Sequence, residues 1–352
     1  MSPSEALPCT RATRFLRACR GQSVDTTPIW IMRQAGRYLP EYRATRNRAG
    51  DFLTLCKTPD LACEVTLQPI DRLGVDAAII FSDILIPLEA MGIPLTFTDG
   101  EGPRLEPVRT AAAVAKLRVP VAEESTGFVM EAIRHTVRAL DGRVPLIGFA
   151  GAPWTLLSYA VEGKTGKAFL DSRRMLFEAP SLAHALLAKI TATTIDYLAA
   201  QVRAGAEALQ LFDSWAGALG PDEYRAFALP YVREIIAALR PVGVPVIYFC
   251  NEGSTLLADV ATVGADVYGI DYRMPLDRAR ALLGDGATLQ GNLDPCALFA
   301  SPDVIERRAA DVIARAGERH IFNLGHGIQP PTPVEHAQAL VEIVHRRGAR
   351  SR

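Results

Sequence analysis

The sequence has no apolar run long enough for a transmembrane helix. Its longest apolar stretch, residues 77–97, is broken by acids and prolines, and residues 1–12 lack the apolar core of a signal peptide. The six cysteines have neither CxxC spacing nor the spacing of a disulfide framework, which favours reduced thiols. A formal net charge of −1 over 352 residues indicates neither a nucleic acid nor an anionic membrane as partner. We therefore expect a soluble, cytoplasmic globular protein.

Several motifs that bind cofactors are also missing. No GxGxxG follows the first apolar run and no GxxxxGK[ST] occurs, so dinucleotide and P-loop sites lack their carriers. There is no HExxH, and the histidines do not cluster at the spacing of metal ligands. Lys164 and Lys167 lie in a polar loop away from any expected strand end, which gives little support to a Schiff base. A reaction without metal or organic cofactor, on a carboxylated substrate, is what remains.

The sequence contains one repeated pattern, in which short apolar runs alternate with longer amphipathic segments. The expected strands are 29–33, 77–82, 145–150, 208–213, 245–250, 267–271, 288–292 and 320–324. The expected helices are 59–73, 123–140, 180–204, 221–240, 253–262, 275–283, 302–316 and 333–347. Strands that are each followed by a helix predict an α/β protein with a closed (β/α)8 (TIM) barrel. No linker divides the chain, so we expect one domain over 1–352, with an extension of about 1–27 before the first strand and a long excursion over 84–122.

The most informative segment is 28–43, PIWIMRQAGRYLPEYR, where an apolar run ends in Arg33 and is followed closely by Gly36 and Arg37. Two guanidiniums this close together repel each other unless an anion lies beside them. Arginine binds carboxylate or phosphate through two parallel hydrogen bonds, so the pair predicts an acid-binding clamp. Gly36 would allow the backbone to approach a ligand. The alternative is that both arginines pair with internal acids such as Glu41.

Polar residues and glycines follow the other expected strands. Since a barrel of this kind builds its active site at the carboxyl ends of its strands, these residues should converge on one rim. They are Ser82, Asp83, Gly151, Asp213, Ser214, Cys250, Asn251, Asp271, Asn292, Asp294, Gly325 and His326. The alternative for each of them is that it caps the helix that follows.

Three of the candidates have features of their own. Asp83 is the only acid in AAIIFSDILIP, and a carboxylate in such a run is costly unless it is hydrogen-bonded or meets a cation. His326 is flanked by glycines that would expose its ring, although it could equally be a loop histidine bonded to a carbonyl. Tyr159 would lie about two helical turns past the third strand, where a lone tyrosine can simply be part of the core.

The segments that carry these residues resemble those of the uroporphyrinogen decarboxylase family. PIWIMRQAGRYLPEYR and GFAGAPWTLLSYAVEG (148–163) are similar to its two long signatures. FSDIL, LFDSWAG and FNLGHGI match further family segments in order, so the resemblance spans about residues 10–347. It implies a single-domain (β/α)8 barrel that works as a homodimer without metal or organic cofactor. The implied reaction converts uroporphyrinogen III to coproporphyrinogen III by turning four acetate side chains into methyls.

The resemblance also implies roles for the residues already singled out. Asp83 would accept hydrogen bonds from the pyrrole N–H groups of the substrate. The substrate-binding turn would comprise Arg33, Gln34, Ala35, Gly36 and Arg37, and the cleft would be lined by Tyr159, Ser214 and His326. The first proton could come from Arg37, although a guanidinium is a poor acid; a bound water or a substrate carboxyl are the alternatives.

Two other functions compete with this one. Methyltransferases of the same superfamily bind zinc through His-x-Cys and a later cysteine, but the corresponding strand here reads IYFCN, with Tyr248 in place of the histidine, and NLGHGI has no cysteine. A non-catalytic tetrapyrrole carrier could use the same cleft.

Overall fold

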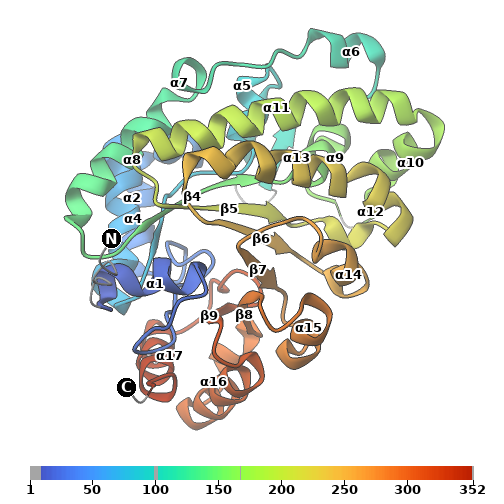
Figure 1. Ribbon diagram of the computed structural model, residues 1–352. Coiled ribbons are helices and arrows are strands. Elements are labelled where there is room, and N and C mark those ends of the chain that lie inside the picture. The colour runs from blue at the N-terminus through green and yellow to red at the C-terminus, as the bar shows by residue number, and fades with distance from the viewer. Residues whose placement is uncertain (1–8, 99–101, 167, 351–352) are drawn as a thin grey trace, which may run out of the picture.

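The structure is a computed structural model that describes residues 9–98, 102–166 and 168–350. Its centre is a curled sheet of seven parallel strands, in the order β1-β4-β5-β6-β7-β8-β9, with helices around the outside (Figure 1). The strands are β1 (Ala78–Ile79), β4 (Leu146–Gly151), β5 (Ala208–Asp213), β6 (Val246–Cys250), β7 (Val267–Ile270), β8 (Thr288–Leu293) and β9 (His320–Leu324). These strands fall on the apolar runs of the sequence, so the α/β class with a parallel sheet is confirmed.

The expected first strand, 29–33, does not form a regular strand. Ile29 makes one parallel bridge to Phe322 of β9, and the Phe322 amide donates to the carbonyl of Pro28 (2.8 Å). On its other side, the Ile29 carbonyl accepts from the amide of Asp76 (2.7 Å), just before β1. The expectation of a full strand was wrong because side chains replace the ladder partners. The Ile29 amide donates to the carboxylate of Asp76 (2.8 Å), and the Met32 amide donates to the side-chain oxygen of Asn323 (2.9 Å).

Three helices begin and end at the expected residues: α4 (Pro59–Leu73), α11 (Pro180–Ala204) and α16 (Pro302–Ala316). Each has proline at its first position, where the missing N–H costs nothing. The expected helix 221–240 is divided into α12 (Pro221–Phe227) and α13 (Leu229–Leu239). Pro230 explains the break, because its ring cannot continue a preceding helical turn.

The remaining expected helices appear with shifted bounds. They are α7 (Ala122–Ser125) with α8 (Gly127–Leu140), η3 (Gly253–Thr255) with α14 (Leu257–Val260), α15 (Leu276–Leu283) and α17 (Val334–Arg347). Elements that the sequence did not predict occupy the connections. They are α1 (Arg11–Cys19), α2 (Pro40–Ala49), α3 (Phe52–Lys57), α5 (Ile86–Ala90), the hairpin β2 (Leu95–Thr98) and β3 (Gly102–Leu105), α6 (Ala111–Lys116), α9 (Pro153–Glu162), α10 (Leu170–Glu178), η1 (Ala216–Ala218), η2 (Arg240–Val242) and η4 (Pro295–Phe299). The expected excursion over 84–122 therefore carries short helices and a hairpin, while its residues 99–101 lie outside the described ranges, as do residues 1–8 of the expected extension.

The two ends of the curled sheet differ. Phe15 of α1 is fully buried in a cluster with Ile147, Ile247 and Ile321, which sit near the amino ends of their strands. Because α1 covers the amino ends of the strands, the carboxyl ends form the accessible mouth. All six cysteines are free thiols. No helix within the described ranges is long and apolar enough to cross a membrane.

Asp76 joins three segments beside β1 at one edge of the sheet. Its carboxylate is fully buried and accepts hydrogen bonds from the Ile29 amide, from Arg14 Nη1 of α1 (2.6 Å) and from His345 Nε2 of α17 (2.7 Å). Arg14 also binds both carboxylate oxygens of Asp25 (2.7 Å each), which keeps the pKa of Asp25 well below its usual range. One buried acid thus ties segment 28–32 to helices from both ends of the chain.

We expect Asp76→Asn to lower the free energy of unfolding by about 3 kcal/mol, because it leaves the mostly buried Arg14 guanidinium without one of its charged partners. Urea denaturation followed by circular dichroism measures the loss. The control is Asp311→Asn, which removes one partner of the exposed pair with Arg315 and should cost less than about 0.5 kcal/mol. Equal losses in the two variants would contradict the central role of Asp76.

Candidate active site

The residues predicted from the sequence come together at the carboxyl ends of the strands. Arg33 follows segment 28–32, Asp83 follows β1, and His326 follows β9, while Tyr159 lies on α9 after β4. Burial has the largest effect on the pKa of each of these three groups, raising it for Asp83 and Tyr159 and lowering it for His326, and the charge of Arg33 acts on all three as well, as expected for side chains that lie close together. Ser214 lies in the loop after β5, on the same rim.

The turn that begins at Arg33 is built mainly by Gln34. The Gln34 side chain accepts from the Ile31 amide (3.1 Å) and donates to the Ala77 carbonyl (3.1 Å), and only 1% of the residue is exposed. The Tyr38 hydroxyl donates to the Gln34 carbonyl (2.8 Å). The side chain of Gln34 is therefore fully engaged in hydrogen bonds to the backbone. This residue can contribute to ligand binding only by fixing the shape of the turn.

The neighbours of Gln34 complete the turn. Arg33 has a left-handed backbone, with φ of 63°, which residues other than glycine seldom adopt. A Cβ at Gly36 would lie 2.8 Å from the carbonyl oxygen of Arg33, so the turn leaves room for glycine alone. Ala35 is partly buried against the main core.

The guanidiniums of Arg33 and Arg37 are exposed, and neither makes a hydrogen bond or an ion pair with any residue in the described part of the chain. Glu41, the internal acid considered above, instead contacts Arg72, with Nε and Oε1 3.2 Å apart. Two unpaired guanidiniums on one turn leave ten N–H donors in total, five from each, for an external anion. The geometry is therefore suited to binding carboxylates or phosphates.

Asp83 is the carboxylate of the mouth, and its side chain is partly exposed. Burial raises its pKa to about 6, against the opposing effects of the Leu85 amide, which donates to it (2.8 Å), and of the Arg33 charge. Within the described ranges no cation lies at ion-pair distance from Asp83. Phe81, two residues before it, packs against Tyr42 and Phe52 at ring distances of 5.7 and 5.9 Å. The carboxylate thus keeps hydrogen-bonding capacity beside an aromatic wall.

Tyr159 packs beside Trp215, and their ring centroids are 5.9 Å apart. Burial, followed by the charge of Asp83, raises the pKa of Tyr159, so the phenol keeps its proton and can donate. Trp215 Nε1 is buried without a hydrogen-bond partner among the described residues. The hydroxyl of the adjacent Ser214, partly exposed, makes no hydrogen bond within the same ranges.

His326 is partly exposed beside Arg33. Burial lowers its pKa, and the charges of Arg33 and Arg273 lower it further, so the ring is neutral near pH 7. Arg273 contacts Glu252 (2.9 Å) and lies over the ring of Tyr272 (4.5 Å). A neutral imidazole can both donate and accept a hydrogen bond at this point of the rim.

Other polar residues at strand ends have structural roles. Asp213 is fully buried, accepts from the hydroxyls of Thr155 (2.7 Å) and Tyr248 (2.8 Å), and has a pKa raised by burial to about 6. Asp294 accepts from the Cys296 amide (2.9 Å) at the start of η4. Asp294 thus caps the helix that follows it, which was the alternative for every strand-end residue, whereas Asp213 is bonded internally to two hydroxyls.

Two residues of this rim, Trp215 and Arg273, were not singled out from the sequence. Trp215 stands in the quoted segment LFDSWAG, directly after the candidate Ser214, and a tryptophan in that polar loop was the available signal. Arg273 follows β7 by three residues and had no comparable signal, because the sequence places an aspartate, Asp271, before it.

The zinc-site alternative lacks a donor set in the described part of the chain, where no three His, Cys, Asp or Glu side chains could hold a metal ion together. Tyr248, at the position where a zinc ligand would be needed, donates to Asp213. Cys250 is buried, and a Cβ at Gly253 would lie 2.4 Å from its sulfur.

The fold and the mouth define a parallel α/β protein suited to a polyanionic small molecule. The family model described as uroporphyrinogen decarboxylase (URO-D) matches residues 10–347. A uroporphyrinogen decarboxylase of Myxococcus xanthus is 56% identical over 337 residues, which cover 95% of this chain and 96% of that protein. One from Carboxydothermus hydrogenoformans is 52% identical, covering 96% and 97%. The chain belongs to the uroporphyrinogen decarboxylase family.

A solved structure described as a methyltransferase from Methanosarcina mazei has the same fold. It aligns with a TM-score of 0.82 over 96% of this chain and 99% of that chain, at 22% sequence identity. At this identity the likeness extends to the fold alone.

We expect carboxyl-carbon NMR of aspartate-labelled protein to show two groups titrating near pH 6, one of which Asp83→Asn removes and the other Asp213→Asn removes. Because the pKa of Asp83 lies above the ordinary 3.8, the folded protein holds this proton more tightly than the unfolded chain. The contribution of Asp83 to stability is therefore largest below pH 4 and is lost as the pH rises toward 6. An Asp83 resonance that titrates near pH 4 would contradict the described burial.

Proposed function

We propose that this protein catalyses the decarboxylation of the four acetate side chains of uroporphyrinogen III, giving coproporphyrinogen III. Its family membership and relatives about half identical in sequence support this reaction. The observation that carries the proposal is the pair of unpaired guanidiniums, Arg33 and Arg37, on the same rim as the partly buried Asp83. A substrate with many carboxylates around a ring of N–H donors is complementary to such a mouth.

Loss of CO2 from an acetate leaves an electron pair on the adjacent carbon, which needs an electron sink. A pyrrole becomes that sink once its ring carbon is protonated to an iminium-like cation. The electrons of the broken C–C bond then neutralise the cation and leave an exocyclic methylene. A second proton on that carbon completes the methyl group, and loss of the first proton from the ring carbon restores the aromatic pyrrole, so that each acetate consumes one proton and releases one CO2. No external oxidant or cofactor is needed for this balance.

Each residue of the mouth has a role in this scheme. Asp83 accepts hydrogen bonds from the pyrrole N–H groups and stabilises the positive charge that develops on the ring, since a preorganised carboxylate in a dry cleft does so better than water. Arg33 and Arg37 bind substrate carboxylates, each charge-assisted bond being worth about 1.5–3 kcal/mol. The hydroxyls of Tyr159 and Ser214 and the neutral ring of His326 bind the remaining carboxylates and line the cleft. In the turn, Gln34 holds the backbone in place through its internal hydrogen bonds, and Ala35 and Gly36 present their backbone to the substrate.

We propose further that the sheet is a closed (β/α)8 barrel forming a single domain, in which segment 28–32 takes the eighth place. The bonds of Ile29 to β9 on one side and to Asp76 on the other support this closure. Six free thiols support a reducing location, which we take to be the cytoplasm.

We expect Asp83→Asn to lower kcat by about a hundredfold or more, because an amide cannot balance the cationic ring. The assay follows coproporphyrinogen formation from uroporphyrinogen under anaerobic conditions, with Asp311→Asn as a charge-matched surface control that should keep the wild-type rate. Tight uroporphyrinogen binding by the wild-type protein without any coproporphyrinogen would identify it as a carrier and overturn the proposal.

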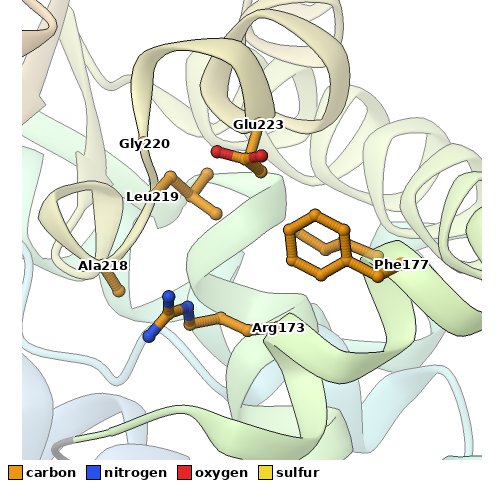
Figure 2. Close-up of a pocket in the computed structure, with 7 residues that line it drawn as sticks. Arg173, Phe177, Ala218, Leu219, Gly220 and Glu223 are labelled. Carbon is orange, nitrogen blue, oxygen red and sulfur yellow. The ribbon is translucent and has the colours of Figure 1, made fainter.

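We also propose that the protein is a homodimer, as the family resemblance implies. We assign the subunit contact to the face that holds a pocket of about 280 Å³ beside α10. Its lining includes Arg173, Leu176, Phe177, Leu219, Gly220 and Glu223, which come from α10 and from the chain around the start of α12 (Figure 2). Phe177 is 68% exposed, and Arg173 and Glu223 have no ion-pair partner among the described residues. A two-fold contact would cover the aromatic ring and pair the two charges across the interface.

Phe177→Asp is expected to convert the dimer to monomer at micromolar concentration, because it places a charge in the apolar part of the contact. Sedimentation velocity measures the change. Leu282→Asp, which alters a 50% exposed residue on α15, is the control and should remain dimeric. Dimers in both variants would exclude this face, and a monomeric wild-type protein would exclude the homodimer itself.

A further inference from the structure

We propose that Gly327 is a positioning residue that directs the side chain of Arg33 across the mouth and so sets the affinity for substrate. This inference rests on the proposed function, because it concerns the arginine that we assign to binding substrate carboxylates. Gly327 is buried in the loop after β9, next to His326. The relevant feature of Gly327 is that it has no Cβ.

The stem of Arg33 lies directly against the α-carbon of Gly327. A Cβ built at Gly327 would lie 2.4 Å from Cδ of Arg33, 2.8 Å from Cγ and 3.0 Å from Nε. Side-chain carbons in a packed protein approach no closer than about 3.5 Å. A single methyl group at this position would therefore have to displace the arginine stem.

Hydrogen bonds on both sides of the contact restrain the backbone from moving to relieve the clash. The Ile328 amide donates to the carbonyl of Met32 (2.9 Å), which joins the residue after Gly327 to the residue before Arg33. On the other side of Arg33, the buried Gln34 fixes the turn through its bonds to Ile31 and Ala77. Since both chain segments are anchored to each other, the arginine side chain is the part that must move.

The other glycines of the mouth do not have this relation to the clamp. A Cβ at Gly325 would meet the backbone of Tyr272, at 2.2 Å from its nitrogen, and one at Gly36 would meet the carbonyl oxygen of Arg33. At both of these positions glycine is needed to leave room for neighbouring backbone atoms, and not for the side chain of Arg33. Gly327 also lies outside the left-handed region, so an alanine there meets no backbone strain and tests the side-chain contact alone.

The direction in which Gly327 allows the Arg33 side chain to run determines which groups lie near the guanidinium. Its charge acts on His326, Asp83 and Tyr159 together, and it has no internal partner in the described chain to hold it there. A displaced stem would carry the guanidinium away from this group, while Arg37 would be untouched. The expected consequence is weaker binding of substrate with the chemistry retained.

The test is a double-mutant cycle of Gly327→Ala and Arg33→Ala, which separates their direct coupling from general damage. Gly327→Ala should raise KM for uroporphyrinogen about tenfold and change kcat less than about threefold, as expected when binding common to ground and transition states is lost. In the Arg33→Ala background, where the stem is gone, the same substitution should change KM less than about twofold. Gly286→Ala, which enters open space, is the matched control and should leave both constants unchanged.

Equilibrium binding of uroporphyrin, followed by fluorescence, repeats the cycle without turnover. An unchanged KM in Gly327→Ala, or an equal rise with and without Arg33, would overturn the inference. Coupling in uroporphyrin binding without any decarboxylation by the wild-type protein would overturn the proposed function and leave the inference standing. If Gly327→Ala lowers the melting temperature too far for assay, the melting temperature of the double variant tests the inference. It should equal that of Arg33→Ala alone, and a lower value would show that the added methyl group displaces something other than the arginine.

Discussion

The attachment of segment 28–32 to both edges of the curled sheet is the constraint on which the mouth depends. Its backbone bonds reach Phe322 on one side and Asp76 on the other, and the buried Asp76 carboxylate takes the Ile29 amide in place of a strand partner. Because Arg33 follows this segment directly, its position relative to Asp83 and His326 is fixed by these bonds. If the turn at Arg33 were carried by a free loop, its position relative to Asp83 and His326 would not be fixed in this way.

The anchoring allows the protein to keep charges unpaired where a ligand needs them. Arg33 and Arg37 lie on one turn without an internal ion-pair partner among the described residues, and the pKa of Asp83 is raised by burial, so the mouth holds uncompensated charge at a cost in free energy. This cost is local, since the whole chain has a net charge of only −1. Elsewhere acids and arginines pair freely, as Arg14 does with Asp25 and Asp76. An anionic substrate with inward N–H groups relieves both kinds of strain at once, which links binding to the proposed chemistry.

The sequence predicted those parts of the fold that local chemistry decides. Helices that open with proline, such as those at Pro59 and Pro302, were placed to the residue, because the signal and the structure obey the same backbone restriction. The strand expected at 29–33 was wrong because its partners are the side chains of Asp76 and Asn323, which are far away in the sequence. The pair of arginines could be predicted because both residues lie in one short segment. The hydrogen bonds of Gln34 to the backbone and the contact of Gly327 with Arg33 could not, because they depend on the folded structure.

Asp83 and Asp213 show what distinguishes a candidate functional acid from a structural one in this mouth. Both follow parallel strands, and burial raises the pKa of each to about 6, so neither position nor pKa separates them. The difference lies in their hydrogen bonds. Both oxygens of Asp213 accept from buried hydroxyls, while Asp83 is partly exposed and accepts from a single loop amide. An acid with its bonds complete can only support its neighbours, and an acid with bonds to spare can meet the N–H groups of a ligand.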